Sequence, residues 1–191
     1  MGIINPNQKL LPSLKQMQDV EHFLASPFQT GILLDVHIAR LESVMRMVKA
    51  KGKQLILHVD LIQGLQSDEA GVEFVCQEFR PLGIISTRTK AILAAKHKKV
   101  LAVQRVFLID SNALEHSYRL MEQTDPDYIE VLPGILPGLI REVKDRTRKP
   151  ILAGGFLRTK EDVEQALAAG AVAVTTSNRA LWKQYAAAEG V

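Results

Sequence analysis

Short apolar runs alternate with amphipathic segments along the whole chain. Eight such runs recur, and after each one the apolar residues return at every third or fourth position. A short continuous apolar run is typical of a strand buried in a parallel sheet. The second pattern is typical of a helix that packs one face against that sheet. The sequence therefore predicts a succession of strand–helix units.

The boundaries of these units follow from the same pattern and from the residues that begin and end helices. The predicted strands cover residues 10–13, 31–37, 55–60, 83–87, 101–105, 128–132, 151–153 and 172–175. The predicted helices cover residues 16–26, a segment from Ile38 to a stop at Gly52, a segment capped by Ser67 that ends near Phe79, residues 88–97, 113–124 and 136–146, a segment between Thr159 and Gly170, and a last segment with Trp182 and Tyr185.

Eight strand–helix units with tight connections predict a single compact TIM-like (β/α)8 barrel that spans residues 1–191. The alternative architecture is an open doubly wound sheet. Pro12 lacks an N–H donor and suits only the end of a strand. If the barrel is incomplete or irregular, we therefore expect the irregularity at the first strand.

Composition changes this interpretation little. The formal charge of +3 is mild, and the single cysteine, Cys76, excludes an internal disulfide framework. Cys76 shares an apolar helix face with Val75 and Phe79, which predicts a core residue and not a nucleophile. The chain starts without a signal-peptide pattern and has no apolar run as long as a membrane span. We expect a cytoplasmic protein without a membrane partner.

The last two predicted strands are followed by turns suited to bind phosphate. In a barrel, the loops after strands seven and eight often form a phosphate site. Glycine lets backbone N–H groups approach an anion, and the next helix N-terminus adds free donors and a positive dipole end. The predicted phosphate-binding residues are Gly154, Gly155, Thr176, Ser177 and Asn178.

Polar residues also stand near the C-terminal ends of the other predicted strands. Side chains alternate along a strand, so Asp35 shares a face with His37, and His58 shares one with Asp60. These strand ends converge on one mouth in a barrel. Two interpretations stay open, a ligand site and a polar plug whose members bind one another. Further polar residues of this kind are Ser86, Gln104 and Glu130.

No catalytic residue, metal ligand or cofactor is assigned. Asp35, His37, His58 and Asp60 are suitable ligands for a divalent ion, but such pairs commonly hold each other instead. No lysine ends a predicted strand, which argues against a Schiff-base lyase. The chain has neither a Walker A loop nor a dinucleotide fingerprint.

Cations cluster in three connections that lead from a helix back to a strand. In a barrel these connections lie at the N-terminal end of the strands. Cations there complement helix dipoles in any protein, and they also form a plausible contact surface for RNA phosphates. The candidate RNA-binding residues are Lys49, Lys51, Lys53, Lys96, Lys98, Lys99, Arg146, Arg148 and Lys149.

Several longer motifs together resemble one protein family. The chain resembles the bacterial glycerol-uptake operon antiterminator regulatory proteins, which respond to glycerol 3-phosphate. The resemblance covers nearly the whole chain. It rests on Leu33-Leu-Asp-Val-His37, Leu57-His-Val-Asp-Leu-Ile-Gln-Gly64, Gly83-Ile-Ile-Ser-Thr-Arg88, Ile129-Glu-Val-Leu-Pro-Gly134, Ala153-Gly-Gly-Phe156 and Thr175-Thr-Ser-Asn178.

This resemblance implies a cytosolic RNA-binding regulator with a TIM-like fold, not an enzyme. In the family, glycerol 3-phosphate promotes binding to a leader mRNA and lets transcription pass a terminator in genes of glycerol use. Carried onto this chain, the phosphate lies on the backbone of residues 154–155 and 177–178. Strand alternation then suggests contacts to the glycerol hydroxyls from Asp35, His58, Asp60, Ser86 and Glu130.

Two other functions stay open on the residues alone. One is a metal-assisted phosphodiesterase or isomerase of a small phosphorylated substrate, with His58 or Glu130 as acid or base. The other is a metabolite-sensing module that binds a protein through Trp182 and Tyr185. The RNA surface is the basic end, the rim of the mouth or the groove of a homodimer, and the sequence does not choose among them.

Overall fold

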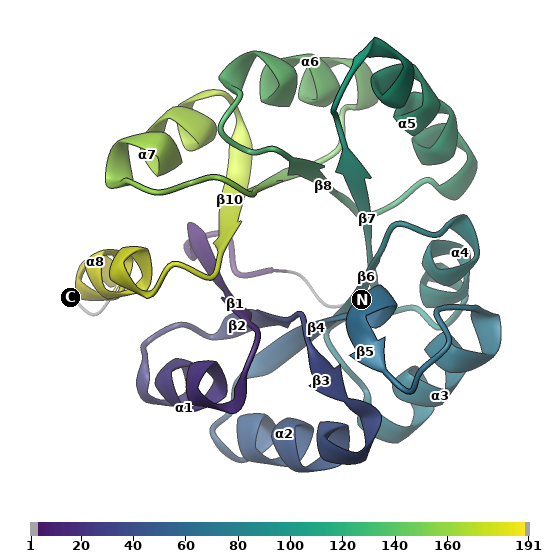
Figure 1. Ribbon diagram of the computed structural model, residues 1–191, viewed down its shortest axis with the longest axis vertical. Helices are drawn as coiled ribbons and strands as arrows, with labels where there is room; N and C mark the ends of the chain where they lie inside the picture. Colours follow the sequence, from purple (N-terminus) through teal and green to yellow (C-terminus); the bar gives the residue numbers. More distant parts are fainter. Residues whose placement is uncertain (1–3, 190–191) are drawn as a thin grey trace.

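Eight parallel strands close into a barrel in the computed structural model, which describes residues 4–189 (Figure 1). Around the barrel the strands are ordered β1-β10-β9-β8-β7-β6-β4-β2. The predicted TIM-like (β/α)8 barrel is thus confirmed, and the open sheet is excluded. The barrel strands are β1 (Leu10–Leu14), β2 (Thr30–Leu33), β4 (Gln54–His58), β6 (Gly83–Ser86), β7 (Leu101–Phe107), β8 (Tyr128–Leu132), β9 (Ile151–Gly154) and β10 (Ala171–Thr176).

The first strand completes the barrel although it contains Pro12. Leu10 to Pro12 pair with β10, and Ser13 and Leu14 pair with β2. Successive residues of a strand turn their N–H groups toward opposite neighbours, so one proline removes only one hydrogen bond. Leu10, Leu11 and Leu14 are fully buried, which holds the strand in place on both of its faces.

The helices form a ring outside the strands (Figure 1). Within residues 4–189 none of them combines the length and the apolar content that a membrane crossing requires. The helices are α1 (Met17–Ala25), α2 (Ile38–Ala50), α3 (Glu69–Phe79), α4 (Thr89–His97), α5 (Ser111–Thr124), α6 (Pro137–Thr147), α7 (Lys160–Ala168) and α8 (Arg179–Glu189).

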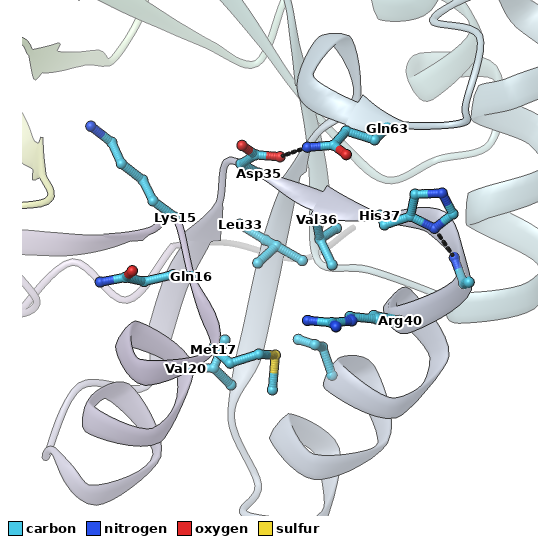
Figure 2. A pocket seen from close by; sticks show the side chains of 12 residues that line it. Lys15, Gln16, Met17, Val20, Leu33, Asp35, Val36, His37, Arg40 and Gln63 are labelled. Carbon is cyan, nitrogen blue, oxygen red and sulfur yellow. Dashed lines mark hydrogen bonds between the residues drawn. The ribbon is translucent and has the colours of Figure 1, made fainter.

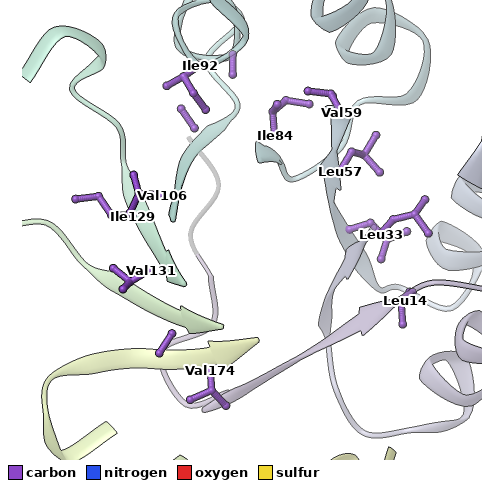
Figure 3. Packing of buried hydrophobic residues seen from close by; sticks show 14 of the residues in the cluster. Leu14, Leu33, Leu57, Val59, Ile84, Ile92, Val106, Ile129, Val131 and Val174 are labelled. Carbon is purple, nitrogen blue, oxygen red and sulfur yellow. The ribbon is translucent and has the colours of Figure 1, made fainter. Parts of the chain in front are cut away.

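Side-chain alternation along the strands divides the core into two layers. One set of residues packs between the strands and the helices, and Figure 3 shows part of it, including Leu33, Ile84 and Val174. The alternate set fills the interior of the barrel, with members such as Ile56 and Leu152. The parity of each strand therefore decides which of its polar residues enters the barrel.

Two predicted strands are shorter than expected, because the chain leaves the barrel after Leu33 and again after His58. It then forms a small separate sheet from β3 (Val36–His37) and β5 (Ile62–Gln63), with a 3-10 turn, η1 (Val59–Leu61), before β5. Extended backbone looks the same in the sequence whether it continues in the barrel or in a second sheet. The prediction that Asp35, His37 and Asp60 lie on barrel strands is therefore wrong.

The start of α3 also differs from the prediction by one residue. The Asp68 carboxylate, and not the Ser67 hydroxyl, caps the helix by accepting a hydrogen bond from the Gly71 amide at 2.9 Å. Cys76 on this helix is buried, as predicted, and burial raises the pKa of its thiol to about 11. The thiol is therefore protonated at neutral pH and belongs to the core.

We predict that Asp68→Ala lowers the free energy of unfolding by about 1 kcal/mol, because the Gly71 amide loses its acceptor. Ser67→Ala is the matched control, since the Ser67 hydroxyl does not cap the helix, and it should change stability by under about 0.5 kcal/mol. Urea denaturation of both variants measures the difference. A larger loss of stability in Ser67→Ala than in Asp68→Ala would show that Ser67 caps the helix, as the sequence predicted.

Candidate functional site

A cavity of about 540 Å³ opens at the C-terminal ends of the barrel strands. Strands β1, β7, β8 and β10 contribute to its wall, together with the loops that follow β9 and β10. This is the end at which barrel enzymes and binding proteins build their sites. The lining residues are Ser13, Lys15, Leu34, Leu61, Arg105, Glu130, Leu132, residues 155–158 and residues 175–178.

Four of the five predicted phosphate-binding residues line this cavity: Gly155, Thr176, Ser177 and Asn178. Gly155 has φ +83°, a conformation that favours glycine. Gly154 stands behind it at the end of β9. A Cβ atom there would lie 2.4 Å from the hydroxyl of Thr175, so Gly154 is needed for close packing.

Asn178 ties the two loops together at the start of α8. Its Oδ1 accepts a hydrogen bond from the Ala180 amide at 3.0 Å, and its Nδ2 donates to the Arg158 carbonyl at 3.2 Å. Helix α8 thus begins at the cavity and turns its positive dipole end toward it. At the start of α7 the amides of Arg158 and Thr159 instead donate hydrogen bonds to the carboxylate of Asp162.

Trp182 secures α8 against the same loop. Its indole Nε1 donates to the Thr176 carbonyl at 2.7 Å, and the side chain is buried. Burial makes Trp182 a docking residue for the last helix and removes it from the surface on which the sequence allowed a protein contact.

A buried ion pair forms one wall of the cavity. Arg105 Nε donates to Glu130 Oε2 at 2.5 Å, and the side chains are only 10% and 1% exposed. The Thr175 hydroxyl donates to the other carboxylate oxygen at 2.7 Å. Both oxygens of Glu130 therefore already have a partner, and the carboxylate fixes Arg105 in the wall.

Arg105 and Lys15 line the cavity but are not among the predicted site residues. β7 runs from Leu101 to Phe107, two residues beyond the predicted strand, and Arg105 lies on it with its side chain toward the barrel interior. The sequence indicates this orientation, because Arg105 alternates along the strand with Leu101 and Val103, which both point into the barrel. Lys15 directly follows β1, which ends at Leu14, and it lines the cavity.

The cavity is electrically positive. Lys15, Arg105 and Arg158 line it, and Glu130 is the one acidic residue among the lining residues. Because Glu130 is bound to Arg105, two cations are left without a carboxylate in the wall. Together with the α8 N-terminus, this arrangement suits a small anion.

Asp60 and Ser86 bind each other and do not line the cavity. The carboxylate of Asp60 accepts hydrogen bonds from the Ser86 hydroxyl at 2.5 Å, the Thr87 amide at 2.7 Å and the Thr87 hydroxyl at 2.8 Å. Burial raises the pKa of Asp60, but these hydrogen bonds outweigh it and hold the pKa below its usual value. Ser86 and Asp60 thus bind each other, as the polar-plug interpretation expects. Gln104 lies on the helix-facing side of β7 with Ala102 and Val106, and its amide donates to the carbonyls of Ser86 and Thr87.

Asp35 and His37 belong to a second cavity, of about 660 Å³, between α1 and α2 (Figure 2). Asp35 accepts from Gln63 Nε2 at 2.9 Å, and His37 Nδ1 accepts from the Ala39 amide at the start of α2. Among residues 4–189, Lys15 alone lines both cavities. The structure thus separates Asp35 from Glu130, and in residues 4–189 no three His, Cys, Asp or Glu side chains are grouped to hold a metal.

His58 is a buried imidazole without a hydrogen-bond partner. It is 2% exposed, and it lies on β4 two residues after the interior residue Ile56. Neither ring nitrogen has a partner within residues 4–189. Burial, followed by the positive charge of Arg105, lowers the pKa of His58 to about 4, although Asp60 and Glu130 oppose this shift. His58 is therefore neutral at physiological pH and has unused hydrogen-bonding capacity.

The predicted RNA-binding cations divide into two groups at the other end of the barrel. The Lys53 ammonium is buried and donates to the carbonyls of Ser26 and Phe28 at 2.7 and 2.5 Å. Lys53 is therefore not available to RNA, contrary to the prediction. Three lysines pair with acids and Arg146 stacks on the Tyr118 ring. The paired lysines are Lys96 with Asp125, Lys98 with Glu73 and Lys149 with Asp125; the remaining candidates, all exposed, are Lys49, Lys51, Lys99 and Arg148.

Comparison with known proteins gives consistent matches over almost the whole chain. A family model described as glycerol-3-phosphate responsive antiterminator matches residues 10–182. A crystal structure of the glycerol uptake operon antiterminator regulatory protein from Listeria monocytogenes superimposes with a TM-score of 0.93 at 40% identity, over 96% of this chain and 99% of that one.

More distant relatives agree with this. A glycerol uptake operon antiterminator-related protein from Thermotoga maritima has a TM-score of 0.81 at 28% identity, over 92% of this chain and 98% of that one. The uncharacterized Escherichia coli protein YgcP is 30% identical over 91% of each chain. Orotidine 5'-phosphate decarboxylase from Pyrococcus horikoshii, at 17% identity and a TM-score of 0.71, covering 94% of this chain and 96% of its own, shares the fold alone.

We predict that His58 makes stability depend on pH between about 6.5 and 4. The folded pKa lies below the ordinary value, so the unfolded chain takes up the proton first as the pH falls. The stability that neutral His58 confers is complete above about pH 6.5 and is lost as the pH approaches 4. Between pH 7 and 4.5 the wild type should lose about 2–3 kcal/mol more than His58→Gln, as measured by urea denaturation. Equal losses in the two proteins would contradict this.

Proposed function

The chain belongs to the family of glycerol-3-phosphate responsive antiterminators, and from this premise we propose that it is a cytosolic, ligand-controlled RNA-binding regulator. In this proposal glycerol 3-phosphate binds in the 540 Å³ cavity at the strand ends. The liganded protein then binds the leader of an mRNA and lets transcription continue past a terminator in genes of glycerol use. The family is a regulatory one, and the barrel serves recognition.

The positive charge of a cavity this small is the observation that carries the proposal. Lys15 and Arg158 extend from the loops, Arg105 is fixed in the wall, and α8 starts beside them. A phosphate carries up to two negative charges and several acceptor oxygens, which charge-assisted hydrogen bonds from such groups satisfy. Gly155 and Ser177 lie at the same place, so backbone and side-chain donors approach from two loops.

The hydroxyl groups of the ligand would meet the wall beneath the phosphate. Glu130 lines the cavity there, and the buried, neutral His58 lies near enough for the charge of Glu130 to act on its pKa. A hydroxyl both donates and accepts, which matches the neutral imidazole with its unpaired nitrogens. Asp60 and Ser86 would support this wall through their hydrogen bond to each other and would not line the ligand cavity. Asp35 would line the neighbouring cavity.

Ligand control requires that the ligand bind more tightly to the conformation that binds RNA. The loops that follow β8 and β9 are connected, since the Gly134 amide donates to the Gly154 carbonyl at 2.5 Å. Phe156 in the second loop lines the cavity, is 67% exposed and has φ +62°. Binding at Gly155 would therefore reorder both loops together. Exposed Ile109, Ile135 and Leu136 on the same rim would offer a surface to a second copy of the chain.

The decisive experiment is a binding titration with a leader RNA from glycerol-use genes of the same organism. Glycerol 3-phosphate should tighten RNA binding by roughly 5- to 150-fold, and the RNA should tighten ligand binding by the same factor. Glycerol and inorganic phosphate, added separately, are the controls for the two halves of the ligand. RNA affinity that is independent of glycerol 3-phosphate would refute the proposal.

Gly155→Asp should abolish the response to ligand, because it puts a negative charge in the cavity wall. In the wild type, glycerol 3-phosphate at 100 times its Kd should raise the melting temperature by roughly 5–10 °C. Gly52→Asp is the matched control. Gly52 also has positive φ, at +68°, and a Cβ there meets no atom within 4 Å, but it lies at the other end of the barrel. Ligand stabilisation that survives in the Gly155 variant would exclude this phosphate position.

A further inference from the structure

The turns that lead from a helix to the next strand share one backbone conformation. In six of the turns described in residues 4–189, a residue at or just after the helix end has positive φ. Two turns use glycine, at Gly52 and Gly170, and one uses Asp125. The other three use a cation. These are Arg80, Lys99 and Arg148, with φ of 45°, 59° and 59°.

Folding alone does not explain these three cations. A residue with a Cβ is disfavoured in the left-handed region, and glycine is the usual residue at the end of a helix. The chain itself uses glycine twice in this role. Arg80, Lys99 and Arg148 are exposed, and none of them makes a salt bridge within the described part of the chain. Three basic residues thus occupy positions whose backbone conformation favours glycine.

The three cations lie at the same end of the barrel, before β6, β7 and β9. Arg80 and Lys99 line one groove of about 460 Å³ together with Lys49, which is also exposed and without a salt bridge. Lys51 caps the end of α2 in the turn before β4. From β4 to β9 the barrel has four inter-strand spacings, an arc of roughly 19 Å. The exposed, unpaired cations therefore follow a curved band along this end.

We propose that Lys49, Lys51, Arg80, Lys99 and Arg148 form the surface that binds the phosphate backbone of RNA. This inference rests on the proposed function and names the face on which the RNA lies. Cations that make no salt bridge are free to bind RNA phosphates and displace the counterions of the RNA, whereas Lys96, Lys98 and Lys149 are already paired with Asp125 or Glu73. The RNA surface and the ligand cavity then lie at opposite ends of the barrel.

The competing explanation is that these cations stabilise the helix ends. A cation near a helix C-terminus interacts favourably with the dipole, and Arg80 and Arg148 are the C-caps of α3 and α6. The two explanations predict opposite changes in stability. Glycine at these positions lowers stability if the dipole interaction dominates, and raises it or leaves it unchanged if the side chains serve a partner.

The test is the triple variant Arg80→Gly, Lys99→Gly, Arg148→Gly, compared with the wild type for RNA binding and thermal stability. The melting temperature should be equal to or above that of the wild type, by up to about 2–4 °C for each glycine. RNA affinity should fall at least tenfold, and the slope of log K against log salt should become shallower by about 2 to 3. Stabilisation by glycerol 3-phosphate should persist.

Two controls separate the surface from overall charge and from backbone effects. The triple variant Arg119→Gln, Arg141→Gln, Lys183→Gln also lowers the formal charge from +3 to 0, but on the outer faces of α5, α6 and α8, and it should retain RNA binding. Asp125→Gly changes the same kind of backbone position without removing a cation, and RNA binding should not weaken.

Three results would overturn the assignment. They are wild-type RNA affinity in the glycine variant, an equal loss of affinity in the glutamine variant, and a fall in the melting temperature of the glycine variant. Wild-type protein that binds no leader RNA with glycerol 3-phosphate present would overturn the proposed function itself, and this surface with it.

Discussion

The buried ion pair between Arg105 and Glu130 connects the packing of the barrel with the chemistry of its mouth. Two unlike charges removed from water are stable only with close contact and further hydrogen bonds, and the Thr175 hydroxyl supplies one of these. Gly154 must be small because Thr175 and Glu130 fill the adjacent space. His58, in turn, is kept neutral partly by the charge of Arg105. The ends of β7, β8, β9 and β10 thus meet at this contact, and His58 of β4 feels its charge.

The order of the strands and helices could be predicted because it depends on local spacing of apolar residues. The same holds for Gly155 and residues 176–178, which line one cavity, whereas Gly154 lies behind it. What could not be predicted depends on distant partners. The partner that neutralises Arg105 inside the barrel is Glu130 on the next strand, and the buried ammonium of Lys53 is satisfied by the carbonyls of Ser26 and Phe28.

The polar strand ends illustrate a second limit. Alternation gives the face on which a residue lies only if the strand continues, and the chain leaves the barrel before Asp35 and before Asp60. Asp60 then turns to Ser86 and Thr87, and Asp35 turns to Gln63. The polar residues that the sequence placed at one mouth are thus divided. Glu130 lines the first cavity, Asp60 and Ser86 bind each other, and Asp35 lines the second cavity. Among the described residues, Lys15 alone lines both cavities, so it is the side chain that they share.

The indole of Trp182 has a practical consequence. It is the only tryptophan among the 191 residues, it is buried, and its Nε1 donates a hydrogen bond to the carbonyl of Thr176, next to Ser177 and Asn178, which precede α8. Excited at the red edge of protein absorption, the protein therefore has one emitting group, located at the mouth of the barrel. Its emission wavelength and lifetime report on the loop after β10 directly, in solution and without a label.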